Sequence, residues 1–157
     1  MSKLKKILPG NKLSTQKLSQ TAPSTKKAIS PALNLAYVEA IKVLKLARLT
    51  ITPIGKWNKH TPALGADGCE VSPTSPLAES FCALGALSFA KNKLGVKNER
   101  ARRALQYVAY FKTAQLHNTP TSLAVVNFND NLLTTQADVL ELFDQAIQRI
   151  LDNAHKA

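Results

Sequence analysis

The first thirty residues limit what this chain can fold into, because they cannot contribute to a hydrophobic core. They contain no aspartate, glutamate or aromatic residue, and they carry seven lysines: Lys3, Lys5, Lys6, Lys12, Lys17, Lys26 and Lys27. The apolar side chains there are too few to offset the entropy lost when the backbone is ordered. We therefore expect a basic, extended arm over residues 1–30 and a helical domain over residues 31–157.

Composition supports one folded domain after the arm. The chain has 157 residues, of which 45% are apolar, so residues 31–157 can bury one core. The formal net charge is +11, and seven of these charges lie in the arm. Outside the arm, Lys97–Arg103 is basic, whereas the C-terminal stretch is acidic. A basic end and an acidic end favour binding to a polyanion or head-to-tail contact between copies.

The cysteine content and the N-terminus indicate the compartment. Cys69 and Cys82 are too few for a disulfide framework and form no CxxC pair, which favours a reduced, intracellular protein. No apolar run is long enough to cross a bilayer. Near the N-terminus, Pro9-Gly10 interrupts the apolar residues before a signal-peptide core can form. The same break leaves only two turns for membrane-surface binding, which is too short to hold the chain there.

Capping residues and apolar periodicity predict an all-α fold, or a mainly α fold with a short hairpin near residues 56–72. Ser30 and Ser75 each precede a proline, which combines an N-cap with the preferred first helical residue. Asn98 and Thr135 are further caps, and Asp138 follows Thr135 as in a capping box. We expect a compact bundle of four to five helices, at about residues 31–49, 76–91, 99–116, 120–128 and from 136 onward.

The apolar residues predict how these helices pack. The helix over 76–91 carries little charge, so we expect it to be the central, buried helix, with Leu77 and Phe81 on its apolar rows. Trp57, the only tryptophan, should hold the 56–72 loop on the core. The inward residues of the last two long helices are predicted to be Ala101, Leu105, Val108 and Phe111, and then Val139, Phe143, Ala146, Ile147 and Ile150.

Cys82 lies in the string Phe81-Cys82-Ala83-Leu84-Gly85-Ala86-Leu87 and has two possible roles. A nucleophilic cysteine needs a lowered pKa and a base within hydrogen-bond reach. The predicted position, inside a helix among apolar neighbours, favours a protonated thiol instead. We therefore expect Cys82 to act as a small buried side chain, and Gly85 to let a second helix approach closely.

Metal and phosphate-loop chemistry are disfavoured. His60 and Cys69 flank one loop, but no two His or Cys residues have a ligand-like spacing of two to four residues. Glycine-rich phosphate-binding patterns do not occur. We expect no metal and no other cofactor.

Phe128-Asn129-Asp130 is a second conspicuous motif. A neighbouring amide and carboxylate can hold a metal or polarise water, but such side chains also cap helices and close turns. The motif lies between two predicted helices, where capping is needed. We therefore expect a structural role for Phe128, Asn129 and Asp130, as for Trp57.

The basic run Lys97–Arg103 opens the third predicted helix. Cations there oppose the helix dipole, at a small cost that is common on solvated faces. Arginine also binds phosphate or carboxylate groups better than lysine does, because its planar guanidinium group can donate two hydrogen bonds at once. Arg100, Arg102 and Arg103 could therefore extend the basic surface of the arm. Because no aromatic residue lies among the arm lysines, any nucleic-acid contact by the arm should be nonspecific and to phosphates.

Several of these motifs together resemble an uncharacterised small helical domain of bacteria and their phages, domain of unknown function 6197. The resemblance covers roughly residues 37–151, excludes the arm, and rests on Trp57, Asp67-Gly68, Phe81–Leu87, Phe128–Asp130 and Thr135 with Val139. The chain departs from the family pattern at Phe128, where tryptophan is usual, and at Lys56, where glycine is usual. The resemblance implies a helical fold and a bacterial or phage source, and it implies no activity.

These observations favour a non-enzymatic structural or assembly protein, most of all a phage virion component of the minor capsid or cement type. Its arm would contact other protein subunits or nucleic-acid phosphates, with no membrane and no small-molecule substrate. We expect it in the virion or the bacterial cytoplasm. One alternative is a nonspecific nucleic-acid-binding protein. Another is a small cysteine-dependent enzyme or regulator that uses Cys82, Asn129 and Asp130 near a loop histidine.

Overall fold

The computed structural model describes residues 31–113 and 120–156, with side chains from Leu35 onward. The predicted arm, with Lys3, Lys5, Lys6, Lys12, Lys17, Lys26 and Lys27, and the predicted helix end at 114–116 lie outside the described residues. The described part is mainly helical, as predicted. None of its helices is both long enough and apolar enough to cross a membrane. Its helices and strands are α1 (Pro31–Ile51), β1 (Ala63–Leu64), β2 (Ser80–Phe81), α2 (Ala83–Leu94), α3 (Arg100–Thr113), the 3-10 helix η1 (Thr121–Leu123), α4 (Ala124–Asp130) and α5 (Gln136–Lys156).

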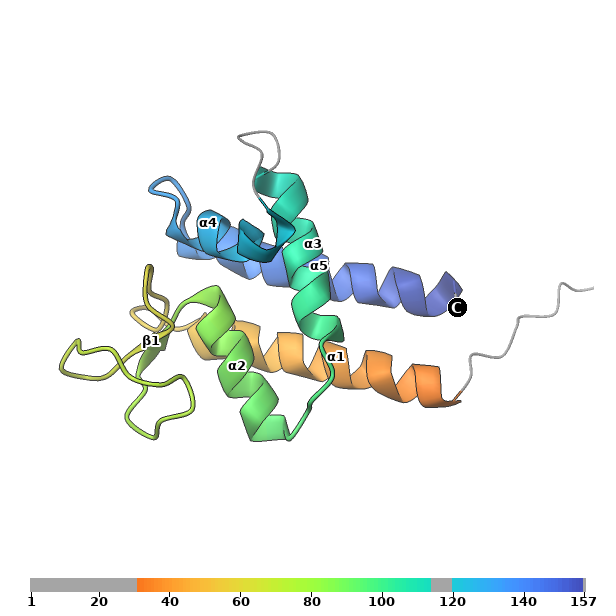
Figure 1. Cartoon of the computed structure of the whole chain (residues 1–157), viewed down its shortest axis with the longest axis horizontal. Helices are drawn as coiled ribbons and strands as arrows, with labels where there is room; N and C mark the ends of the chain where they lie inside the picture. The colour runs from red at the N-terminus through yellow and green to blue at the C-terminus, as the bar shows by residue number, and fades with distance from the viewer. Residues whose placement is uncertain (1–30, 114–119, 157) are drawn as a thin grey trace, which may run out of the picture.

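Helix α1 is the central helix of the domain. It contacts α2, α3 and α5, whereas α2 packs mainly on α1. The prediction that the helix near 76–91 would be central was therefore wrong. Figure 1 shows α1 and α5 side by side, with the start of α1 and the end of α5 at the same end of the molecule.

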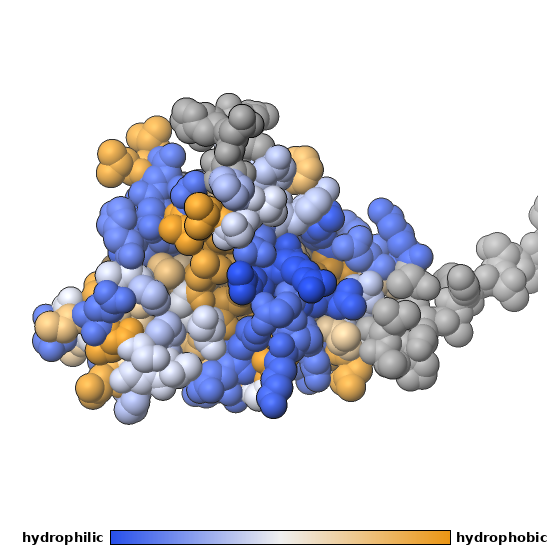
Figure 2. Space-filling view, viewed as in Figure 1, coloured by the Kyte–Doolittle hydropathy of each residue, from blue (hydrophilic) through white to orange (hydrophobic). Residues whose placement is uncertain are grey.

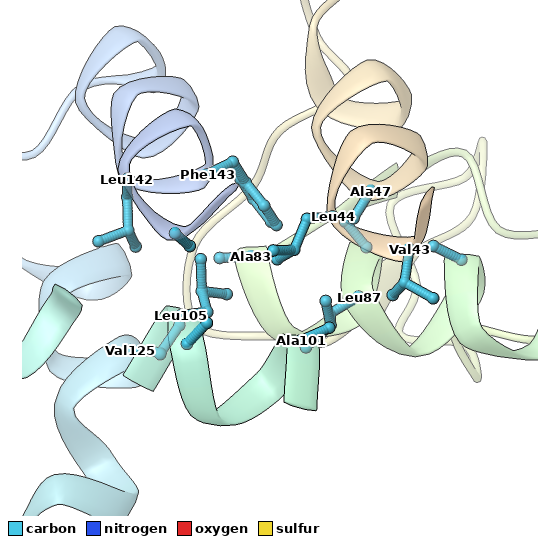
Figure 3. Close-up of a cluster of buried hydrophobic side chains, with 14 of the residues drawn as sticks. Val43, Leu44, Ala47, Ala83, Leu87, Ala101, Leu105, Val125, Leu142 and Phe143 are labelled. Carbon is cyan, nitrogen blue, oxygen red and sulfur yellow. The ribbon is translucent and has the colours of Figure 1, made fainter. Parts of the chain in front are cut away.

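The hydrophobic core fills the space between α1, α3 and α5. Figure 3 shows Leu44, Leu105 and Phe143 converging from these three helices, and all three are fully buried. The predicted stripe of the last helix is confirmed at Val139, Phe143, Ala146 and Ile150, which are buried. On α3, however, Phe111 is 57% exposed and stacks on Tyr107 at a centroid distance of 4.6 Å. Six residues after Leu105, at about 100° per residue, Phe111 lies about 120° around the helix from it and so outside the buried face.

Helix α2 begins at Ala83, seven residues later than the predicted start at Pro76. The Ser75 hydroxyl does accept a hydrogen bond from the Leu77 N–H, but it closes only a turn. The backbone N–H groups of Glu79 and Phe81 donate to Leu64 and Lys56, so they are used outside a helix. Leu77, which was expected on an apolar row, is consequently 68% exposed.

The short hairpin near residues 56–72 is present in an altered form. A turn over Gly65–Gly68 connects Leu64 to Glu70, and these two residues pair in an antiparallel bridge. The regular strand pairing is instead between β1 and β2, in antiparallel register. Trp57 is partly buried and packs against the core, as predicted. These pairings tie the segment between α1 and α2 to the start of α2.

The caps predicted for the third and last helices form. The Asn98 side-chain oxygen accepts a hydrogen bond from the Arg100 N–H at 3.2 Å. Asp138 Oδ2 accepts from the Thr135 N–H at 2.8 Å, and Thr135 Oγ1 accepts from the Asp138 N–H at 3.3 Å. This reciprocal pair is the capping box that the sequence predicts. The pKa of Asp138 is lowered mainly by its hydrogen bond from the Thr135 hydroxyl.

Candidate functional site

A cleft of about 430 Å³ lies between the first turns of α3, the end of α5 and the first half of α1. Its polar lining is basic and aromatic. Figure 2 shows strongly hydrophilic side chains gathered over the start of α3. We call this feature the arginine cleft and define it by Tyr37, Arg100, Arg103, Tyr107 and Arg149.

Two arginines of the cleft lie on tyrosine rings. The guanidinium carbon of Arg100 is 4.3 Å from the centre of the Tyr37 ring, and that of Arg149 is 3.1 Å from the centre of the Tyr107 ring. Tyr37 is 8% exposed, so its ring is a fixed support for Arg100. Stacking restricts both guanidinium groups and leaves their edges available for hydrogen bonds.

The position of α3 is set by Asn98. Its side-chain oxygen caps the helix at the Arg100 N–H, while its amide group donates to Glu39 Oε2 of α1 at 2.7 Å. Arg100 and Arg103 lie three residues apart, which places them on the same face of α3. The buried Ala104 and Leu105 hold α3 on the core beside them.

The charge of the cleft is not neutralised by the described part of the chain. Glu99 lies at its edge but pairs with Lys91, and this hydrogen bond is the main reason why the pKa of Glu99 is lowered. Among residues 35–113 and 120–156, Arg100, Arg103 and Arg149 form no ion pair and no side-chain hydrogen bond. Three guanidinium groups therefore face the cleft with unused donors.

The structure places only part of the predicted basic surface in this cleft. Arg100 and Arg103 line it, but Arg102 is exposed outside it and lies 3.8 Å from Glu99. Arg149 was missed because only the packing of α5 against α3 brings it to the cleft. A usable signal was that Arg149 is the only arginine of the acidic C-terminal stretch, and that it precedes Asn153 by one helical turn.

A second group of predicted residues meets at Asn129, which is 2% exposed. Its side-chain oxygen accepts hydrogen bonds from Trp57 Nε1 at 2.9 Å and the Ala83 N–H at 3.1 Å. Its amide group donates to the Asn58 carbonyl at 3.2 Å and to Asp130 Oδ1 at 2.7 Å. We call these contacts the Asn129 network. It joins the loop after α1, the start of α2 and the end of α4.

The Asn129 network uses every polar group of its central side chain. The amide has two donor hydrogens and one oxygen with two acceptor positions, and all four are paired. Asp130 is also engaged, because its Oδ1 accepts from the backbone N–H of His60, whose φ is 70°. Phe128 is partly buried and packs against the core. The motif therefore holds three segments together, which agrees with the structural role predicted for it.

Cys82 caps α2 and does not lie inside it, which corrects the sequence-based expectation. Its sulfur accepts a hydrogen bond from the Gly85 N–H at 3.3 Å. The helix cannot extend further toward the N-terminus, because the N–H of Cys82 donates to the Pro62 carbonyl. Gly85 lies against this same carbonyl, so the close approach at the glycine involves a loop and not a second helix.

Cys82 also borders a small cavity of about 120 Å³ together with His60, Asn129 and Asp130. The structure thus brings together the residues that a cysteine-dependent enzyme would use. His60 Nδ1 lies 3.7 Å from Asp130 Oδ2. Burial, however, raises the pKa of the Cys82 thiol, which opposes formation of the nucleophilic thiolate. The Asn129 amide has no free group to offer a substrate.

Thiol reactivity tests the role of Cys82. In a Cys69→Ser background, which removes the exposed cysteine, Cys82 should react slowly with a disulfide reagent at neutral pH and rapidly after unfolding in urea. The same chain with Cys82→Ser is the blank. Fast reaction of the folded protein, at the rate of an unhindered thiol, would instead favour the cysteine-dependent alternative.

The described residues contain no group of three His, Cys, Asp or Glu side chains that could hold a metal ion. His60 and Cys69 flank the same loop, as the sequence indicates. The carboxylate of Asp67 accepts a hydrogen bond from the backbone N–H of Cys69 at 3.0 Å, which is the main cause of its lowered pKa. This contact closes the turn within the loop.

Comparison with known proteins identifies one related family. The match covers residues 36–149 and is to DUF6197, described as a family of unknown function. It includes both the arginine cleft and the Asn129 network. No curated protein and no solved structure matches the chain.

Proposed function

The chain belongs to the family of unknown function DUF6197, and we propose that it is a non-catalytic structural or assembly protein that attaches through its basic end. The basic end consists of the arm over residues 1–30 and the arginine cleft. One observation carries the proposal: three guanidinium groups in one cleft are left without an acidic partner among the described residues. Unpaired, oriented arginines are suited to bind carboxylates or phosphates of another molecule.

The start of α1 lies close to the cleft. The arm precedes α1, whose Ala36 and Tyr37 line the cleft within two turns of the helix start. The described chain therefore begins at the end of the domain that carries the three arginines, and we infer that a partner bound there meets both the cleft and the arm lysines that precede α1 in the sequence. The exposed acidic residues of α5 lie outside the cleft; Asp144, for example, pairs with Arg48.

A non-catalytic role is supported by the use of the conspicuous polar residues. Asn129 is fully paired within the fold, Asp130 fixes the loop at His60, and Cys82 caps α2. Each of these groups has a structural partner. The arginines of the cleft, by contrast, keep free donors among the described residues, and guanidinium groups bind anions but do not exchange protons at neutral pH.

Within this proposal, a phage virion component of the minor capsid or cement type is the specific form that we favour. A polar arm that orders on binding can cover a long surface with little mass. Thirty extended residues can reach about 100 Å. The arm would then lie along neighbouring protein subunits or along packaged nucleic acid.

The salt dependence of DNA binding separates these two partners. If all seven arm lysines contact phosphates of duplex DNA, the logarithm of affinity should fall against the logarithm of salt concentration with a slope near about −6. Replacing the seven lysines with glutamine should make that slope shallower by about 6. Replacing them with arginine, which keeps the charge, should preserve it. Fluorescence anisotropy with a labelled duplex, over salt concentrations from about 50 to 200 mM, measures it.

Each result of that titration has a consequence. A slope that the glutamine replacement leaves unchanged would show that the arm does not contact the DNA. If the wild-type chain does not bind duplex at low salt, nucleic acid is excluded as the partner of the arm, and the assembly version must rest on protein subunits. Binding that depends on base sequence would contradict a backbone contact.

A further inference from the structure

The arginine cleft has features beyond positive charge. Its three guanidinium groups come from two helices, and they converge on a cavity of about 430 Å³. That volume is within the range of small-molecule sites, about 300–1,000 Å³, and is larger than a single inorganic phosphate requires. The N-terminal end of α3, which carries a partial positive charge, opens onto the same space. A ligand with more than one negative group and additional bulk would fill it.

Stacking on tyrosine gives the arginines a defined orientation. Arg100 on Tyr37 and Arg149 on Tyr107 each use one face of the guanidinium plane. The edges, with their N–H groups, remain available for paired hydrogen bonds to phosphate oxygens. The second face of a guanidinium plane can stack on an unpaired base, as in recognition of single strands. The cleft therefore combines guanidinium N–H groups that can bind phosphates with flat guanidinium faces on which bases can stack.

We propose that the arginine cleft binds the sugar-phosphate backbone of a single nucleic-acid strand, with bases stacked against Arg100 and Arg149 and without reading of base sequence. This inference rests on the proposed attachment through the basic end and names the partner of the cleft. Arg103, which is exposed and does not stack on a ring, contributes a phosphate contact at the rim.

The surroundings of the cleft favour a strand over a free nucleotide. The cleft is not enclosed, and exposed basic side chains continue beyond it at Lys97 and Arg102. The seven arm lysines precede α1 in the sequence, and Ala36 and Tyr37 of α1 line the cleft. A strand can leave the cleft and follow these charges, whereas a mononucleotide cannot. Glu99 also lines the cleft, but its carboxylate pairs with Lys91.

The test uses the full chain and a labelled single-stranded oligonucleotide of mixed sequence, followed by fluorescence anisotropy at several salt concentrations. The triple variant Arg100→Gln/Arg103→Gln/Arg149→Gln should lose about tenfold or more in affinity, and its salt slope should become shallower by about 2. The matched control is Lys45→Gln, which removes an exposed positive charge of α1 that does not line the cleft. It should leave the affinity and the slope unchanged.

A second variant keeps the test valid if the triple variant does not fold. Arg103→Gln removes only an exposed, unstacked arginine, so the fold should survive, which a thermal unfolding midpoint checks. It should reduce the slope by about 0.7 and the affinity by a few fold. An unchanged slope and affinity in this folded variant would count against the cleft as a phosphate contact.

The arm variant with seven glutamines distinguishes failure of this inference from failure of the proposed function. If the arm variant loses binding and the triple cleft variant binds as tightly as the wild type, the cleft inference is overturned while attachment through the arm stands. If the wild-type chain binds no oligonucleotide at low salt, the inference is overturned and the proposed function is left with a protein partner only.

Competitors test the class of ligand. Inorganic phosphate and a nucleoside monophosphate should displace the oligonucleotide only at far higher concentration than an unlabelled strand. Equal competition by the monophosphate would overturn the proposal that the cleft binds a strand, and would indicate a nucleotide site instead. Equal competition by polyglutamate of the same charge would overturn it in favour of an acidic protein surface, because carboxylates lack the bases that stack on guanidinium planes.

Discussion

Replacing Gly85 with alanine should destabilise the folded domain by about 3 kcal/mol or more, even though alanine is the better helix former. A Cβ atom at this position would lie 1.7 Å from the Pro62 carbonyl oxygen and 2.7 Å from its carbon. Backbone atoms cannot move aside as a flexible side chain does. The loop at Pro62 and the start of α2 would have to separate, which would break the hydrogen bond from the Cys82 N–H to the Pro62 carbonyl.

The sign of this effect makes the prediction specific. At an exposed helical position, glycine to alanine stabilises by about 1 kcal/mol. The matched control is Ser88→Ala, because Ser88 lies three residues after Gly85 in α2 but is exposed. This substitution should be neutral or slightly stabilising. Urea unfolding followed by circular dichroism measures both. A Gly85→Ala protein as stable as the wild type would show that α2 and the Pro62 loop do not pack this closely.

Replacing Asn129 with alanine should cost about 3 kcal/mol of the free energy of unfolding. The change leaves the buried Ala83 N–H without its acceptor, and it also removes the partners of Trp57, Asn58 and Asp130. An unsatisfied buried polar group costs about 1–3 kcal/mol, and at least one such group is created here. Asn127→Ala is the control, because Asn127 is an exposed residue of the same helix.

A double-mutant cycle separates the Asn129 network from packing. Trp57→Phe keeps an aromatic ring but removes the Nε1 donor, and it should cost about 1 kcal/mol in the wild-type background. In the Asn129→Ala background the same change should cost much less, because the acceptor is already gone. Additive effects of the two substitutions would mean that the hydrogen bond between these residues contributes nothing to stability.

The helices that the sequence predicts correctly have signals close along the chain. α1 starts at the predicted proline, and the capping box of Thr135 and Asp138 opens α5 as expected. The apolar stripe from Val139 to Ile150 faces the core. A cap and a 3.6-residue period depend only on neighbours within a few residues, so they can be recognised without the tertiary structure.

The start of α2 depended on residues far away and was therefore mispredicted. Ser75-Pro76 carries the same start signal as Ser30-Pro31, yet the backbone after it pairs with Lys56 and Leu64. The N–H of Ala83 is then capped by Asn129, which lies 46 residues further along the chain. Tertiary hydrogen bonds therefore outweighed the local start signal at Ser75-Pro76. As a result, Cys82 is the cap of α2 and not an interior residue of it.

The two sites were predictable to different degrees. Trp57, Cys82, Asn129 and Asp130 were each singled out from the sequence as structural, although nothing in it showed that three of them share one network. Arg100 and Arg103 were singled out by local charge. Arg149 was not, because only the packing of α5 against α3 brings it across the cleft from them.

By itself, the sequence determined that the described chain is mainly helical, where most helices begin, and that seven lysines without acids precede the domain. These properties follow from composition and from contacts within a few residues. Only the tertiary structure decided where α2 begins and which arginines share a cleft. Both depend on groups that are distant in sequence: the Asn129 oxygen at the Ala83 N–H, and Arg149 brought beside Arg100 by the packing of two helices.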